Sequence, residues 1–175
     1  MKLVKSAVTA AIGALSARPA AGHAGMNDLE IAHTAYTAGQ LDIRYAHLAL
    51  AVSENDSVRA FANTMIRDHT AVNDAAIALI QDLKVTPQDN DLSQALVKGA
   101  SDKRNELSGL RGSVFDCAYA QNELAYHQIV NQTVENDFIP SVTVPPLKSL
   151  LADALVTFKV HEPVSYTHLR AHETG

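Results

Sequence analysis

The feature that most constrains the fold of this chain is a long apolar repeat, residues 58–83, that contains an ionisable pair, Asp68-His69. Apolar residues recur there at intervals of three, four or seven, the spacing that lines up side chains on one face of an α-helix. They are Val58, Phe61, Met65, Val72, Ala76, Leu79 and Leu83. Because a helix advances about 100° per residue, His69 falls near the centre of this face and Asp68 at its edge. We therefore predict a helix whose buried face has to accommodate both groups.

Further segments show a helical period and could cover that face. They are residues 28–52, 113–137 and a last helix from Pro146, with a less regular helix at 91–110. In the segment 28–52 the expected seam is Leu29, Ala32, Tyr36, Gly39, Ile43, Ala46 and Leu50. A polar turn at 54–57 should join this helix to the next as an antiparallel hairpin, with Asn55 or Asp56 as the cap. We expect residues 140–146 to form an extended linker, because they include three prolines.

Composition restricts the chain to a narrow set of protein classes. A length of 175 residues suits one domain, and 47% apolar with 19% charged residues is typical of a soluble globular protein. The net charge of −5 offers no electrostatic footprint for nucleic acid, and no segment of the mature chain approaches the about 20 apolar residues of a membrane span. Cys117 is the only cysteine, which excludes an internal disulfide and a thiolate-rich metal site. The sequence leaves open a homo-oligomer and an envelope protein partner.

The first 24 residues have the layout of an export signal. Lys2 and Lys5 precede a short apolar run at 6–17, and small residues lead up to Ala24. A charged start, an apolar run too short to span a bilayer and a small-residue cleavage site are the three expected regions. We therefore predict a periplasmic or secreted protein that is cleaved after Ala24.

The segment 163–175 breaks the helical pattern and carries no apolar period. It resembles the translated sequencing-adapter tail that ends many reading frames assembled from environmental reads. We therefore expect this segment to be non-native, and we exclude His168 and His172 as ligands.

Ionisable residues on three of the predicted helices could meet inside the bundle. They are His69, His127, His161, Asp68, Asp116 and Glu123, and Asp42 is a further carboxylate that could lie nearby. Imidazole nitrogens and carboxylate oxygens are ligands of zinc, iron and manganese, so one interpretation is a metal site. The other is structural: each histidine is held by a neighbouring carboxylate in a buried pair that selects one packing arrangement. The sequence leaves both interpretations open.

The order and spacing of these residues resemble a known family. Phe61-Ala62, Met65 and Asp68-His69 are followed by Phe115-Asp116, Tyr119, His127 and a late His161. This combination resembles, over residues 27–162, an exported bacterial family known as domain of unknown function 4142. The resemblance implies an all-α fold, a ferritin-like antiparallel four-helix bundle, with residues 91–110 as an extra helix before the third long helix. The chain departs from the family in having Asp42 where glutamate is common.

A di-iron centre does not follow from that resemblance. Ferritin-like di-metal proteins take a glutamate from each of two helices and a Glu-x-x-His pair from each of the other two. Here Glu30-Ile-Ala-His33 is the only such pair, and its helical phase points away from the seam. We expect instead an exported cell-envelope protein with a non-enzymatic binding or stress-related role. The alternative is a metal-binding redox protein with a histidine and carboxylate site for iron, manganese or zinc.

Overall fold

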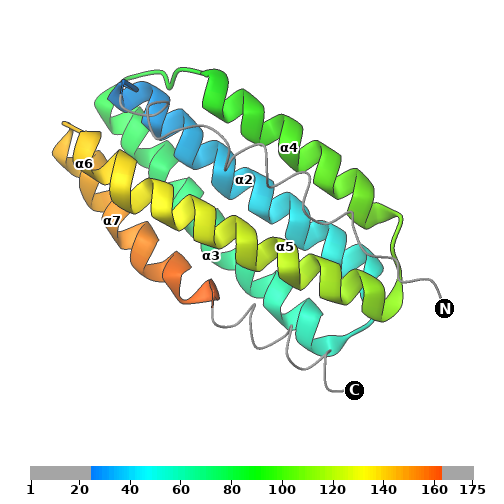
Figure 1. Ribbon diagram of the computed structural model, residues 1–175. Coiled ribbons are helices and arrows are strands. Elements are labelled where there is room, and N and C mark those ends of the chain that lie inside the picture. The colour runs from blue at the N-terminus through cyan, green and yellow to red at the C-terminus, as the bar shows by residue number, and fades with distance from the viewer. Residues whose placement is uncertain (1–24, 163–175) are drawn as a thin grey trace.

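The computed structural model describes residues 25–162, which form a set of helices packed side by side (Figure 1). The helices are α2 (Asp28–Val52), α3 (Asp56–Leu83), α4 (Asp91–Ser108), α5 (Gly112–Thr133), a π-helix (Val134–Phe138), α6 (Ile139–Ser141) and α7 (Pro145–Lys159). No strand occurs between residues 25 and 162, so the prediction of an all-α fold is confirmed. The predicted export signal at 1–24 and the predicted non-native tail at 163–175, with His168 and His172, lie outside the described residues.

The helix α2 lies at the centre of the packing. It runs along α3, α4 and α5, and α7 packs against α3 and α5 on the opposite side (Figure 1). The predicted hairpin of α2 and α3 is present, and the predicted extra helix is α4. Five helices therefore pack together, the number expected from four long helices and one extra helix, and none in the described part is long and apolar enough to cross a membrane.

Asparagine side chains set the starts of three helices. Asn27 Oδ1 accepts hydrogen bonds from the N–H groups of Leu29 and Glu30, and the Glu30 carboxylate accepts one from the N–H of Asn27, which completes a capping box. Asn55 caps α3 and Asn90 caps α4 in the same way, through their Oδ1 atoms. Of the two caps predicted for α3, the structure selects Asn55.

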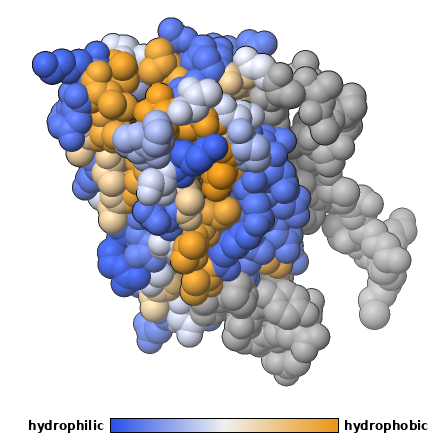
Figure 2. Space-filling model, turned by 90° about the vertical axis from the view of Figure 1, so that its left-hand side faces the viewer, coloured by the Kyte–Doolittle hydropathy of each residue, from blue (hydrophilic) through white to orange (hydrophobic). Residues whose placement is uncertain are grey.

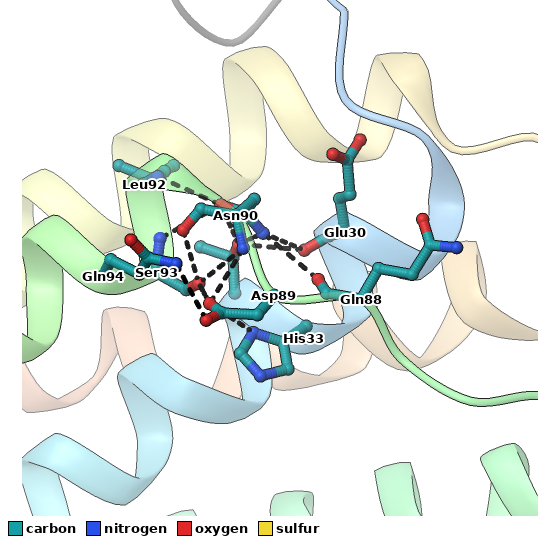
Figure 3. Close-up of polar contacts among 9 residues, drawn as sticks. Glu30, His33, Gln88, Asp89, Asn90, Leu92, Ser93 and Gln94 are labelled. Carbon is teal, nitrogen blue, oxygen red and sulfur yellow. Dashed lines mark hydrogen bonds and ion pairs between the residues drawn. The ribbon is translucent and has the colours of Figure 1, made fainter.

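A network around Asn90 fastens the start of α4 to α2 (Figure 3). Asn90 Nδ2 donates to Thr34 Oγ1 at 2.9 Å and to the Glu30 carbonyl at 3.1 Å. Asp89 accepts hydrogen bonds from Ser93 Oγ and Gln94 Nε2, and it lies 3.7 Å from His33 Nδ1. The pair Glu30 and His33 is thus engaged in this network and does not face the bundle core.

The linker before α7 is shorter than predicted, because the chain stays helical through Pro140. A proline cannot donate to the preceding turn, and the π-helix Val134–Phe138 widens the turn where that bond is lost. Of the predicted linker 140–146, only residues 142–144 are outside a helix.

The start of α7 is anchored to the start of α2. The Asp28 carboxylate accepts hydrogen bonds from Thr143 N (3.1 Å), Thr143 Oγ1 (2.8 Å) and Val144 N (2.8 Å). Val144 offers no side-chain cap to α7, and the Asp28 carboxylate instead binds the two residues that precede the helix. This anchor sets the register of α7 and brings its far end, at Phe158 and His161, against α3 and α5.

Candidate metal centre

Four buried polar side chains from four parts of the bundle meet at its middle. Asp42 comes from α2, His69 from α3 and His127 from α5, while His161 follows the end of α7. They are 0%, 4%, 2% and 3% exposed, respectively. The ring of Phe158 stacks on His69 with centroids 4.1 Å apart, so the imidazole of His69 is held in place by α7.

The distances among these atoms match the edges of a small coordination polyhedron. His69 Nε2 lies 3.4 Å from His127 Nε2, and Asp42 Oδ2 lies 3.5 Å from the first and 3.6 Å from the second. His161 Nδ1 lies 3.1 Å from His127 Nε2. Zinc bonds to nitrogen or oxygen are about 2.1 Å long, which places tetrahedral ligands about 3.4 Å apart. Acceptors around an ammonium ion, with hydrogen bonds of about 2.8 Å, would be about 4.6 Å apart. The spacing therefore fits direct coordination of a metal ion.

The outward hydrogen bonds of two rings determine where their lone pairs point. His127 Nδ1 lies 2.9 Å from the Glu123 carbonyl oxygen, to which it can only donate. His161 Nε2 lies 3.1 Å from Asp68 Oδ2 and donates to that carboxylate. We assign both rings neutral tautomers on this basis, with lone pairs on His127 Nε2 and His161 Nδ1, which face each other. Two facing lone pairs repel unless a proton or a metal cation lies between them.

Burial shapes the electrostatics of the cluster. Both oxygens of Asp42 are buried without a hydrogen-bond partner, which is costly for a carboxylate unless a cation neutralises it. Burial lowers the pKa of His69 to about 4, so this ring is neutral at pH 7. Burial, and then the nearby Asp42 carboxylate, raise the pKa of Glu123 well above its ordinary value. The cluster thus combines neutral imidazoles with one carboxylate aimed between them.

The structure brings most of the predicted site residues together, in different positions around the cluster. The three histidines offer nitrogen atoms within 4.8 Å of one another, and Glu123 groups with Asp42 and His127. Asp68 contacts His161 and is held in turn by Arg67 Nε at 2.7 Å, so it is an outer partner rather than a ligand.

Asp116 does not join the cluster. Its Oδ1 accepts a hydrogen bond of 2.5 Å from Ser53 Oγ in the turn between α2 and α3. This carboxylate therefore supports the hairpin, and the described residues that group as ligands do not include it.

Asp42 is the residue that sequence reasoning left outside its main set of ligands. The predicted seam of α2 was centred on Tyr36 and Ile43, whereas the buried face contains Ile31, Ala38, Asp42, Tyr45 and Ala49. The phase was wrong by about one residue. A carboxylate three residues after Gly39 and four before Ala46 is the signal that could have found it, because both of those residues were already placed in the seam.

Comparison with known proteins yields a family and no closer relative. A family model described as domain of unknown function (DUF4142) matches residues 14–163. No curated protein and no solved structure matches the chain.

Proposed function

Since the chain belongs to the DUF4142 family, whose function is unknown, we propose a function from the buried cluster itself: the protein binds one transition-metal ion through His69, His127, His161 and Asp42. The observation that carries this proposal is the convergence of two lone pairs, each oriented by an outward hydrogen bond, on one space beside an unpartnered carboxylate. Carboxylate or carbonyl partners that orient ligating histidines are a regular feature of metal sites.

Zinc is the metal that best fits these ligands. Three imidazoles with one carboxylate suit zinc, whereas calcium and magnesium prefer shells made of oxygen atoms alone. The four distances given above match edges of a tetrahedron, whereas iron and manganese more often take additional oxygen ligands.

Binding of one ion by all four of these side chains would leave no position open, which favours a binding role over catalysis. Catalytic zinc sites keep a position open for water or substrate, and closed sites stabilise the fold. A redox protein, the alternative raised by the sequence, would need a metal that changes its oxidation state, which zinc does not do. We therefore propose a non-enzymatic metal-binding protein.

Elemental analysis of protein purified without a histidine tag tests this function. We expect close to one equivalent of zinc, or one equivalent taken up from excess zinc and retained through gel filtration. His69→Ala and His161→Ala should each lose the ion, while His47→Ala, an exposed histidine on α2, should retain it. Cobalt substitution should give the intense visible absorption of tetrahedral Co²⁺. The proposal would be contradicted by protein that retains no metal after incubation with zinc and whose melting temperature is the same with and without zinc.

We also propose that the protein acts in the cell envelope after export. The support for this is the charged, apolar and small-residue layout of residues 1–24. N-terminal sequencing of the protein from the cell envelope should begin just after Ala24, and a sequence beginning at Met1 would refute export with cleavage.

A further inference from the structure

An apolar cavity of about 90 Å³ extends from the histidine layer into the half of the bundle that contains α6. On α2 it runs from Asp42 back to Ala32, on α3 from His69 forward to Ile80, and on α7 from Phe158 back to Leu147. Because neighbouring helices run in opposite directions, all of these steps lead toward the same end of the molecule (Figure 1). Figure 2 looks onto that side and shows a band of hydrophobic residues between hydrophilic ones.

Small side chains create this space. Ala35 on α2, Ala76 on α3 and Ala154 on α7 line the cavity, at positions where a larger residue would fill it. No lysine or arginine is among the described residues that line it. The walls are thus apolar and carry no positive charge.

Two buried amides stand at the inner end, one helical turn beyond the histidines. Asn73 follows His69 by four residues and is 3% exposed, and Asn131 follows His127 by four and is 2% exposed. Asn73 Nδ2 and Asn131 Oδ1 have no hydrogen-bond partner. Asn131 Nδ2 donates to Glu162 Oε1 at 2.7 Å, which orients this amide with its oxygen as the remaining acceptor. The cavity therefore presents one unused donor and one unused acceptor.

Gly39 makes room for the donor. A Cβ atom at this position would lie 2.7 Å from Asn73 Oδ1 and 3.1 Å from Asn73 Nδ2. Glycine inside a helix costs about 1 kcal/mol relative to alanine, and at position 39 it leaves the space that the Asn73 amide occupies. Leaving a buried polar atom unsatisfied costs a further 1–3 kcal/mol or so, which a suitable ligand would recover.

We propose that this cavity binds a short, unbranched, uncharged aliphatic molecule that ends in a hydroxyl group. A hydroxyl can accept from Asn73 Nδ2 or donate to Asn131 Oδ1, since both residues line the cavity, and the alkyl chain then lies among the alanines. A negatively charged head is disfavoured because Asp42 lines the same cavity and no cationic side chain does. An engineered apolar cavity of about 150 Å³ takes a benzene ring, so this smaller space suits a chain of about four carbons. The site goes beyond the metal centre and does not require an ion there.

Titration of the full-length protein with alkan-1-ols from ethanol to octan-1-ol tests the site. Binding should be saturable in the side-chain amide NMR signals of Asn73 and Asn131, with an affinity that peaks near butan-1-ol and falls for longer chains. Methyl propyl ether, an isomer of butan-1-ol that cannot donate, should bind about tenfold more weakly, the equivalent of one hydrogen bond of about 1.4 kcal/mol. No saturable shift with any alcohol would overturn the proposal and leave a cavity that holds only water.

Two neighbouring substitutions on α3 provide the matched control. Ala76→Leu fills the cavity and should abolish binding, whereas Ala75→Leu places the same side chain on the exposed face and should preserve it. Equal binding by both variants would contradict the site. If Ala76→Leu does not fold by circular dichroism, Ala35→Val replaces it. Both leucine variants should retain one equivalent of zinc, so failure of the alcohol site and failure of the metal site are distinguishable.

Discussion

For single residues, the position of a proton decides what the buried cluster can bind. His161 can present a lone pair at Nδ1 only while its Nε2 proton is held elsewhere, and Asp68 holds it. Arg67 in turn orients Asp68 from the exposed side. The exposed Arg67 thus influences which nitrogen of the buried His161 carries the proton, through its contact with Asp68 and the contact of Asp68 with His161.

Asp68→Asn should weaken zinc binding by about 10- to 100-fold, the usual effect of losing an outer partner of a ligating histidine. The amide is a weaker acceptor than the carboxylate, so the preferred tautomer of His161 is less well maintained. Competition with a chromophoric chelator measures this affinity. Asp74→Asn, an exposed change on the same helix, should have no effect, and equal affinities for the two variants would count against the role of Asp68.

Glu123→Gln should stabilise the metal-free protein more as the pH rises. The folded state keeps the Glu123 proton because its pKa is raised, while the unfolded state loses it above about pH 4.5. Wild-type stability from this group therefore falls with increasing pH, by up to about 1.4 kcal/mol per unit, until the folded pKa is reached. Glutamine carries no such proton, and the contribution of His69 is present in both proteins and cancels.

Urea denaturation of both proteins at pH 5 and pH 7 checks this, and the difference in unfolding free energy between them should be larger at pH 7. A gap independent of pH would show that Glu123 is ionised in the folded state. The carbonyl that orients His127 is part of the backbone, so zinc binding should survive the substitution.

For whole helices, local sequence determined the boundaries well and the buried faces less well. Asparagine caps and prolines act through the nearest turns, and the limits of α2 agree with the segment expected from the sequence. The buried face of α2 was harder to predict than its limits. Alanines and tyrosines distribute apolar surface around this helix, so two different faces fit the apolar pattern. Only packing against α3 and α5 buries Asp42, and that information is not present in α2 alone. Pro140 suggested a break in the helix, but the π-helix before it accommodates the proline and the chain stays helical.

The end of α3 has an avoidable strain. Lys84 adopts a left-handed conformation with φ 55°, which favours glycine. Lys84→Gly should stabilise the protein by about 1 kcal/mol, because the side chain is exposed and the Cβ clash is relieved.

Gly112 at the start of α5 provides the reverse experiment. It has the same φ of +55°, with open space around the position of a Cβ, so Gly112→Ala should cost about 1 kcal/mol through the backbone alone. Urea denaturation measures both changes. Shifts of the same sign at Lys84 and Gly112 would be inconsistent with backbone strain as the cause.

For the molecule as a whole, contacts far apart in the sequence place the site, and periodicity could not predict them. The Asp28 carboxylate joins α2 to the turn before α7 across more than half of the described chain. The sequence indicated that histidines from three helices could converge. It did not indicate that the Asp28 anchor sets the position of His161 along the axis of the bundle.

Asp28→Ala should therefore affect both stability and metal binding. Loss of the hydrogen bonds to Thr143 and Val144 should destabilise the protein by about 1–2 kcal/mol. Hydrogen exchange followed by mass spectrometry should show faster exchange in α7 than in α4, and zinc affinity should fall because His161 is held less firmly. Asp82→Ala, an exposed change at the end of α3, is the control. Uniform acceleration across all helices would mean that Asp28 acts on global stability only.

His161 lies just beyond α7 and is therefore the last of the four proposed ligands along the chain. The other three come from α2, α3 and α5. An incomplete set of ligands holds an ion loosely and allows it to exchange, and docking of the last turn closes the shell. A bound ion would then hold α7 against the other helices, so that release of the ion and detachment of α7 would occur together.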